Sequence, residues 1–498
     1  MNTHNRSTAE AFANGATEHR RQEVQQAIDS ACDQMRSEGV HPRDYVEQLS
    51  WLFFLKAFEE TENRRADEAS FDDQSYQRRL DSDYRWSAWA KKTDRADEML
   101  ALVNGKLWPH LQQLGDDSLA ERFRRIFSSV KNHQSRGPSF ARVVAQVDKL
   151  HFSERTDVIV LSEIYERLLK DVAQVSGYAG EFYTPRHIIR AMVQVVAPRL
   201  GDRIYDPCFG SAGFLSESAE YIRRNKKSWS GEALNRFHRE TFFGREMVPL
   251  AYLMGTMGLL LHDVHDPALE LLNTLEVHTT NPSESSKYTV ILANPPYGGK
   301  MAQQLQTNFT VRSGSTEVLF LQHIMIYLAR GGRAGVIVPE GVLFRGGPDQ
   351  KVRERLLTEF NLHTVLSLPA GCFLPYTGVK TNILFFNREE NERGTDGIWY
   401  YELTNDGFEL KQTRRPIEGD QFPDFLSKWK DRVTGDNSWI VPISEIKKKG
   451  WDISAKNPNR RDDYEHRPAL ELVQSIKAKE ERIFDLLEEL EGMLEEAE

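Results

Sequence analysis

An apolar run leads directly into a proline-rich turn in the stretch YTVILANPPYGG, residues 288–299. The run Tyr288–Leu292 has the β-branched and apolar composition of a buried strand. The two prolines that follow fix φ and lack backbone N–H groups, so the chain leaves the strand in a rigid, extended turn. The stretch therefore predicts a strand that presents a fixed turn at its end, formed by Asn294, Pro295, Pro296 and Tyr297.

This turn offers groups that suit an exocyclic amino group. The Asn294 side-chain oxygen and the Pro295 carbonyl can both accept hydrogen bonds from one planar NH2. Two such acceptors pull the nitrogen toward tetrahedral geometry and localise its lone pair for attack. The Tyr297 ring can stack on a base, which contributes about 1–3 kcal/mol per base in single-strand binding. An ordinary strand-ending loop would need none of these features.

The turn resembles the catalytic motif of amino-group methyltransferases that depend on S-adenosylmethionine, and a matching cofactor half lies upstream. The segment RIYDPCFGSAGFL, residues 203–215, predicts a strand, an Asp206-Pro207 turn and the start of a helix. Gly210 and Gly213 allow the backbone to approach a ligand closely. The spacing matches neither GxGxxG nor a P-loop, which disfavours nicotinamide and nucleoside triphosphate cofactors. A glycine-rich turn alone is often structural, but the pairing with residues 294–297 predicts a cofactor site.

Two further segments fit such a site. Glu246 ends the short strand that begins near Thr241, where a ribose-binding carboxylate belongs. In the segment GEFYTPRHI, residues 180–188, the pattern predicts Thr184 as a helix N-cap and Pro185 as the first helical residue. The neighbouring Tyr183 suits a wall of the cofactor's methionine pocket.

The rest of the chain divides into a helical part and an α/β part. Apolar residues recur at helical spacing in Tyr45–Phe58 and Val158–Leu169, without strand signals between them. After Gly177, short β-branched runs alternate with helical stretches, which predicts a mostly parallel sheet covered on both faces. We expect strands at Arg203–Tyr205, Thr241–Gly244, Tyr288–Leu292, Ala334–Val338, His363–Ser367, Asn382–Phe386 and Ile398–Leu403.

Composition excludes several classes of protein. The 498 residues are 40% hydrophobic and 28% charged, which favours a large folded core over a disordered chain. The most apolar stretch, Val248–Leu261, is shorter than the roughly 20 residues that span a membrane. The three cysteines lie far apart and outside any CxxC pair, and no histidine motif typical of a metal site is present. We therefore expect a cytoplasmic protein without a disulfide framework, a metal site or a membrane span.

The acidic charge is concentrated at the C-terminal end. Residues 465–498 contain eleven acidic and four basic residues, a net of −7, so the remaining chain carries only −3 of the total −10. The same segment predicts a helix with a heptad seam, in which seven of eight positions are apolar. The seam positions are Ala469, Leu472, Ile476, Lys479, Ile483, Leu486, Leu490 and Met493. Such a helix either packs on its own protein or meets a helix of another chain.

Several segments together resemble the modification subunit of type I restriction-modification systems, a γ-class adenine-N6 DNA methyltransferase. These segments are residues 180–188, 206–215, 294–297, 331–339 and 368–373, and the cofactor half precedes the catalytic half. Residues 451–458 are also typical of the C-terminal part of this family. The resemblance covers most of the chain, from about residue 40 to residue 498.

The resemblance implies an α/β fold in three parts. These are a helical N-terminal domain (residues 1–172), a seven-strand Rossmann-like methyltransferase domain dependent on S-adenosylmethionine (173–445), and a C-terminal segment with a long helix for subunit assembly (446–498). It also implies methyl transfer to N6 of an adenine that has been flipped out of double-stranded DNA. The implied partners are a specificity subunit, with two modification subunits for each, and an ATP-dependent restriction subunit.

Residue roles follow from the pattern and the resemblance together. Catalysis is assigned to Asn294, Pro295, Pro296 and Tyr297. Cofactor binding is assigned to Glu181, Tyr183, Thr184, Asp206, Pro207, Gly210, Ser211, Gly213, Phe214, Glu246, Asn273 and Asn294. The chain departs from the family at Ala212, which replaces a common glycine, and at Tyr297, where phenylalanine is commoner. Asn273 replaces an aspartate that would contact the cofactor adenine, although its side-chain oxygen can still accept a hydrogen bond.

Two other functions remain open from the sequence. An amide of a protein glutamine or an amino group of RNA presents the same chemical problem as adenine N6. A methyltransferase fold kept only as a DNA-binding scaffold is the other alternative. The intact turn at residues 294–297 and Asp206 weigh against a scaffold, and a methyl-transfer assay on DNA, ribosomes and release factors separates the first alternative.

Overall fold

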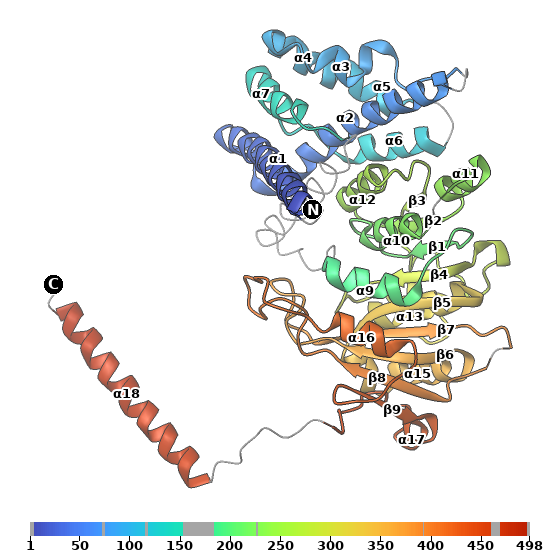
Figure 1. Cartoon of the computed structure of the whole chain (residues 1–498), viewed down its shortest axis with the longest axis vertical. Coiled ribbons are helices and arrows are strands. Elements are labelled where there is room, and N and C mark those ends of the chain that lie inside the picture. Colours follow the sequence, from blue (N-terminus) through green and yellow to red (C-terminus); the bar gives the residue numbers. More distant parts are fainter. Residues whose placement is uncertain are drawn as a thin grey trace.

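The computed structural model describes residues 4–71, 75–114, 118–152, 184–225, 228–391, 393–459 and 469–495. A group of N-terminal helices lies against one end of an α/β part, and a long C-terminal helix lies apart from both (Figure 1). Within the described residues, no helix is long and apolar enough to cross a membrane.

The N-terminal part is built from helices alone, as the sequence predicts for its described residues. These helices are α1 (His4–Ser37), α2 (Pro42–Phe71), α3 (Trp86–Trp89), α4 (Ala96–Leu102), α5 (Trp108–Gln112), α6 (Ser118–Ser129) and α7 (Gly137–Asp148). The predicted amphipathic run Tyr45–Phe58 lies in α2, where Val46, Leu49 and Phe53 are buried. The second predicted run, Val158–Leu169, lies outside the described residues.

One mixed sheet forms the α/β part. Its order is β3-β2-β1-β4-β5-β7-β6-β8-β9. The strands are β1 (Ile204–Asp206), β2 (Phe242–Glu246), β3 (Ala268–Leu271), β4 (Tyr288–Ala293), β5 (Leu328–Pro339), β6 (Asn361–Ser367), β7 (Thr381–Asn387), β8 (Gly397–Glu402) and β9 (Ser438–Pro442). Strands β3, β2, β1, β4 and β5 run parallel, whereas β7 and β9 are antiparallel to their neighbours.

The expected seven strands correspond to β1, β2 and β4–β8, but the sheet has nine strands in the described residues. The two strands that the sequence missed, β3 and β9, are the edges of the sheet. Each is short and mostly exposed or half-buried, with Leu269 the buried residue of β3 and Ser438 and Trp439 those of β9. Short edge strands of this kind lack the continuous apolar run by which buried strands are recognised.

Helices cover both faces of the sheet, as expected for this alternation of elements. They are α9 (Arg186–Val196), α10 (Gly213–Arg224), α11 (Gly231–Arg239), α12 (Pro249–Leu261), α13 (Thr316–Tyr327), α14 (Gly341–Phe344), α15 (Pro348–Glu359), α16 (Phe422–Trp429) and α17 (Ile443–Lys448). Successive residues of β4 enter different cores: Val290 and Leu292 join the core that includes α9 and α12, while Ile291 and Ala293 join the core that includes α13 and α15. The two-residue period of a strand explains this division.

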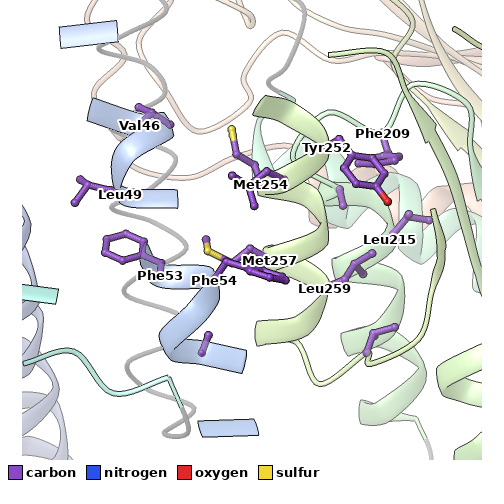
Figure 2. Packing of buried hydrophobic residues seen from close by; sticks show 14 of the residues in the cluster. Val46, Leu49, Phe53, Phe54, Phe209, Leu215, Tyr252, Met254, Met257 and Leu259 are labelled. Atoms are coloured by element: carbon purple, nitrogen blue, oxygen red, sulfur yellow. The ribbon is translucent and has the colours of Figure 1, made fainter. Parts of the chain in front are cut away.

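The helical part and the sheet part share one hydrophobic core. Helix α12 packs against α2, with Met254 and Met257 on the side of α12 that faces α2 (Figure 2). Beyond the end of α12, Arg64 of α2 forms an ion pair with Asp263 at 2.6 Å. Helix α12 is therefore enclosed between the N-terminal helices and the sheet.

The C-terminal helix α18 (Ala469–Glu495) has the opposite environment. Ile476, Ile483 and Leu486 on its predicted seam are 59%, 57% and 46% exposed. The side chains of the other apolar seam positions lie outside the described residues. In Figure 1, α18 lies away from the helices and strands of the main body.

Candidate functional site

The predicted catalytic and cofactor segments meet at one edge of the sheet. Strands β1, β2 and β4 are parallel neighbours, so their carboxyl ends lie side by side. Asp206 ends β1, Glu246 ends β2, and Asn294 follows the last residue of β4. In open α/β sheets, ligands bind at this edge.

One pocket collects most of the predicted cofactor residues. Of these, it is lined by Thr184, Asp206, Gly210, Ser211, Gly213, Phe214 and Asn294. Three further lining residues, Ile189, Cys208 and Phe209, were not assigned a role from the sequence. Ile189 lies about one helical turn after the start of α9, and this position could have identified it from the sequence as a residue that lines the pocket.

Backbone hydrogen bonds hold the loop that follows β1. Asp206 Oδ1 accepts from the Cys208 N–H at 3.1 Å. Glu246 Oε2 accepts from the Gly210 N–H at 2.9 Å, while its Oε1 accepts from the N–H groups of Met247 and Val248 at 2.8 Å. Glu246 therefore joins the end of β2 to the loop and to the start of α12, and Oε2 can accept a further hydrogen bond.

Two residues of this loop have a left-handed backbone. Gly210 has a φ of +52°, which glycine adopts without steric cost. Ala212 has a φ of +59° immediately before α10, at the position where the family commonly has glycine. The alanine is tolerated in this conformation, which for a non-glycine residue costs of order 1–3 kcal/mol.

Asp206 is a buried carboxyl group, 1% exposed. Burial raises its pKa to about 8, the Cys208 N–H counteracts that rise, and the charge of Glu246 adds to it. No Lys, Arg or His side chain among the described residues forms an ion pair with Asp206 within 4.0 Å. A cation bound in the pocket would supply the missing opposite charge.

The Asn294 amide is fixed by two other residues of the site. Its Nδ2 donates to Thr184 Oγ1 at 2.9 Å, and the Tyr297 hydroxyl donates to its Oδ1. The predicted N-cap at Thr184 is wrong, because α9 begins at Arg186 with Pro185 as its cap residue and no side-chain cap. Thr184 instead uses its hydroxyl oxygen to orient Asn294.

A second, larger pocket begins on the other side of the turn. It has a volume of about 690 Å³ and is lined by Tyr297, Gly298, Gly299, Lys300, Met301, Gln306, Gly314, Ser315, Glu317, Pro339, Arg345, Tyr376, Thr377 and Val379. Phe373 meets the Tyr297 ring edge-on, with ring centroids 6.4 Å apart. Asn294 lines the first pocket and Tyr297 the second, so the turn separates two binding spaces.

A buried ion-pair network that the sequence did not reveal joins the segments around these pockets. Arg414 Nη2 contacts both oxygens of Asp406 at 2.6 Å, and His187 Nε2 lies 3.1 Å from Asp406 Oδ2. Burial alone would raise the pKa of Asp406, but its hydrogen bonds to His187 and Arg414 outweigh burial and lower it. Arg414 also donates to the Cys372 carbonyl. The network therefore ties α9 to the loop that carries Phe373.

Some predicted residues lie elsewhere in the fold. Asn273 follows β3, does not line either pocket, and uses Oδ1 to accept from the Leu275 N–H at 3.1 Å. The Pro207 carbonyl accepts from Thr274 Oγ1 at 2.6 Å, and the Pro296 carbonyl accepts from Thr316 Oγ1 at 3.2 Å. Glu181 and Tyr183 lie outside the described residues. The described part of the chain contains no group of His, Cys, Asp and Glu side chains suited to hold a metal ion.

Comparison with known families decides the identity of this arrangement. The family model described as N-6 DNA Methylase matches residues 156–467, and the model described as HsdM N-terminal domain matches residues 24–147. The chain belongs to the N-6 DNA methylases. The methylase subunit of the type I restriction enzyme EcoEI from Escherichia coli is 32% identical over 463 residues, which cover 90% of this chain and 92% of that relative.

Solved structures agree with this assignment. A modification subunit from Vibrio vulnificus YJ016 matches with a TM-score of 0.79 and 32% identity, covering 90% of this chain and 99% of that one. A chain from a structure of type I restriction-modification complex assembly matches with a TM-score of 0.73 and 36% identity, covering 96% and 99%. The protein is therefore a type I modification subunit and a DNA adenine methyltransferase.

Proposed function

We propose that this methylase subunit takes its methyl group from S-adenosylmethionine bound in the pocket between α9 and the loop after β1. The observation that carries the proposal is the position of Asn294, which lines the first pocket and accepts a hydrogen bond from Tyr297, a residue that lines the larger pocket. Two reactants bound in these two pockets would be adjacent at Asn294. Such an arrangement favours direct transfer between them.

The residues of the first pocket fit this cofactor. S-adenosylmethionine carries a sulfonium and an ammonium charge, and the buried Asp206 carboxyl group, which has no ion-pair partner among the described residues, would supply an opposite charge when the bound cation favours its ionised form. Gly210, Ser211 and Gly213 present backbone close to the ligand. Glu246 does not line this pocket, but its Oε2 holds the Gly210 N–H that borders it, and we propose that Oε2 also accepts from a ribose hydroxyl. When bound, the cofactor supplies an electrophilic methyl group with a good leaving group.

The second pocket suits the flipped adenine. Tyr297 would stack on the base, and Asn294 Oδ1 and the Pro295 carbonyl would accept hydrogen bonds from N6. Thr184 keeps the Asn294 oxygen pointed toward the base by occupying the amide nitrogen. The Tyr297 hydroxyl donates to the same oxygen without substrate, so N6 either shares this oxygen with the hydroxyl or displaces it when the base enters.

Glu181, Tyr183 and Asn273 have weaker support for a role in cofactor binding. Glu181 and Tyr183 immediately precede Thr184 in sequence, which favours their participation. Asn273 lies beyond the end of β3, next to β2 at the ligand-binding edge, but its side-chain oxygen is engaged by Leu275. We propose that Glu181 and Tyr183 line the cofactor pocket. We also propose that Asn273 contacts the cofactor adenine, with its Oδ1 accepting from both the Leu275 N–H and the adenine amino group.

The exposed face of α18 supports a role in subunit assembly. Ile476, Ile483 and Leu486 form an apolar seam, which Val473 and Leu487 widen, at 48% and 56% exposed. An apolar stripe of this size marks an interaction surface. We propose that it joins the helical spacer of a specificity subunit, with two modification subunits for each, and that this partner reads the DNA sequence. An ATP-dependent restriction subunit completes the complex.

A methyl-transfer assay tests the function. The chain with its specificity subunit, given tritiated S-adenosylmethionine, is expected to label cognate double-stranded DNA at adenine N6. Label on release factors or ribosomes instead would support another amino-group methyltransferase. Calorimetric absence of cofactor binding would support a scaffold.

Co-purification tests the proposed assembly. Deletion of residues 468–498, or Ile483→Asp with Leu486→Asp, is expected to prevent binding of the specificity subunit because charges cannot be buried cheaply in an apolar seam. The single variant Ile483→Asp is compared with Gln474→Asp, a matched control that adds the same charge at an exposed position off the seam. Cofactor binding by all these variants is expected to equal that of the wild type. Complex formation by the truncated chain would place the interface elsewhere.

A further inference from the structure

The side chain of Phe209 occupies a slot between a strand and a helix. It is 3% exposed, although it belongs to the loop that lines the cofactor pocket. A Cβ atom added to Gly244 of β2 would lie 2.6 Å from Cδ1 of the ring. A Cβ atom added to Gly255 of α12 would lie 2.6 Å from Cε2 and 2.8 Å from Cδ2. The slot therefore has glycine on both sides because the ring leaves no room for a larger residue.

Gly255 also lies against the backbone of the same loop. Its added Cβ would be 2.9 Å from the Gly210 carbonyl oxygen. The N–H group of Gly210 is meanwhile held by Glu246 at 2.9 Å. The backbone of Gly210 is thus confined between α12 and the end of β2, and the same residue lines the cofactor pocket.

Helix α12 cannot easily move away from the loop. Met254 and Met257 on its other side face α2, whose Phe53 and Phe54 belong to the same hydrophobic core (Figure 2). All four side chains are at most 3% exposed. Since protein interiors are close-packed, an atom added at Gly255 must displace the atoms that it meets. These belong to the Phe209 ring and the Gly210 carbonyl, and their loop, unlike α12, has a pocket on one side into which it can shift.

We propose that Phe209 and Gly255 are positioning residues for the cofactor. The fit of the ring into its slot sets the position of Gly210 and Ser211, and α12, held by the N-terminal helices, provides the wall of that slot. The inference rests on the proposed binding of S-adenosylmethionine in this pocket. It gives the N-terminal helices an indirect part in cofactor affinity, because they keep the wall in place.

The first test compares two glycine-to-alanine changes on α12 in the full-length chain. Gly255→Ala is expected to weaken S-adenosylmethionine binding at least tenfold by calorimetry, because its Cβ displaces Phe209 and the Gly210 carbonyl. Gly258→Ala is the matched control, since its Cβ would make an ordinary contact of 3.4 Å with the Ser211 carbonyl. Both changes raise helix propensity equally. Equal affinity of Gly255→Ala and wild type, or equal losses in the two variants, would overturn the proposal.

The second test is a double-mutant cycle. Phe209→Val keeps an apolar side chain but lacks the ring atoms that a Cβ atom at position 255 would meet. Gly255→Ala is therefore expected to cost clearly less affinity in the Phe209→Val background than in the wild type. Additive losses would show that Gly255 acts independently of Phe209, and would overturn the pairing. The cofactor-free melting temperatures of the variants separate a local displacement from general destabilisation.

Two outcomes keep the inference apart from the proposed function. A wild-type chain that does not bind S-adenosylmethionine contradicts the proposed function, whereas a wild-type chain that binds it and an unaffected Gly255→Ala variant contradict only the positioning role. If Gly255→Ala does not fold, Phe209→Val alone decides the question. It enlarges the slot and is expected to weaken cofactor binding at least fivefold while the chain stays folded, and unchanged affinity would overturn the proposal.

Discussion

The two pockets on either side of the turn at Asn294 are built in different ways. The pocket lined by Asp206 and Gly210 is the proposed cofactor side, and the pocket lined by Tyr297 is the proposed base side. On the cofactor side, Asp206, Glu246 and Gly210 are buried. Asp206 accepts a hydrogen bond from the Cys208 N–H, and Glu246 accepts one from the Gly210 N–H. On the base side, the wall contains Gly298, whose added Cβ would meet nothing within 4 Å, and Val379, which is 48% exposed. The first side is fixed by packing, whereas the second is open.

This difference indicates an order of events. The described walls of the proposed cofactor pocket are held by packing and backbone hydrogen bonds, so we expect it to bind its ligand in the isolated subunit. On the proposed base side, the Tyr297 hydroxyl already donates to the Asn294 oxygen, so an incoming N6 group must share that oxygen or displace the hydroxyl. Cofactor binding should then be independent of DNA and of the specificity subunit, while base binding should depend on both.

The largest effect is expected at the residue that both sides share. Asn294→Ala removes an acceptor for N6, and loss of one preorganised polar group in an active site lowers kcat about 10²–10³-fold. S-adenosylmethionine affinity is expected to fall much less than kcat, because Asn294 lines the cofactor pocket but its side-chain oxygen is proposed to act on the base. Turnover on cognate DNA and calorimetry on the same preparation measure the two quantities. Near-normal turnover would remove Asn294 from catalysis.

The second effect concerns the cofactor side and its dependence on pH. The pKa of Asp206 is raised to about 8 by burial, so the cofactor-free group is largely protonated at neutral pH. A cationic cofactor favours the carboxylate, so binding releases a proton and affinity rises with pH until about 8. Asp206→Asn is expected to weaken binding about 10–100-fold at high pH, as for a lost charge-assisted hydrogen bond, and to abolish this pH dependence.

Stability of the cofactor-free chain provides the control for Asp206. Its folded-state pKa is raised above the unfolded value of about 3.9, so the protonated group stabilises the fold. That contribution is complete below the unfolded pKa and is lost as pH rises through about 8. Asp206→Asn is expected to reduce the fall in melting temperature between these pH values. An identical pH profile in both proteins would show that Asp206 ionises normally.

The same contrast explains what could be predicted from the sequence. Asp206, Gly210 and Asn294 could be placed together, because carboxyl ends of parallel strands meet at one edge and each motif follows a recognisable strand. Strands β3 and β9 could not, since short edge strands with exposed positions lack a buried-strand pattern. The interior strands of the sheet can therefore be recognised from their own sequence, whereas the two edge strands cannot.

Contacts between distant side chains carry no such signal. The hydrogen bond of Thr184 to Asn294 joins residues 110 positions apart, and local pattern assigned Thr184 to a helix cap instead. The slot of Phe209 depends on Gly244 and Gly255, which lie in a strand and a helix with no motif of their own. Only the packed structure shows that these residues act on one loop.

Thr184→Val tests whether the cofactor side orients the catalytic amide, with a smaller expected effect. Valine keeps the shape of threonine but cannot accept from Asn294 Nδ2, and a typical hydrogen bond contributes about 0.5–1.5 kcal/mol. We expect kcat to fall about 3–10-fold because Asn294 is less well oriented. Thr184→Ser retains the acceptor and should preserve kcat. Equal losses in both variants would assign the effect to packing around Thr184.

The smallest effect is expected on the base side, from Tyr297→Phe. Phenylalanine keeps the stacking ring but lacks the hydroxyl that occupies Asn294 Oδ1 without substrate. N6 then no longer competes with this hydroxyl for the Asn294 oxygen, so KM for cognate DNA is expected to fall about 2–5-fold, within the range of one such bond. The kcat value should change little, because the ring that positions adenine remains, and S-adenosylmethionine affinity should be unaffected. Steady-state kinetics with the specificity subunit present measure these constants, and Tyr297→Leu, which removes the ring, is the control that should raise KM. A rise in KM for Tyr297→Phe would show that the hydroxyl binds the substrate, and that the base side is complete before DNA arrives.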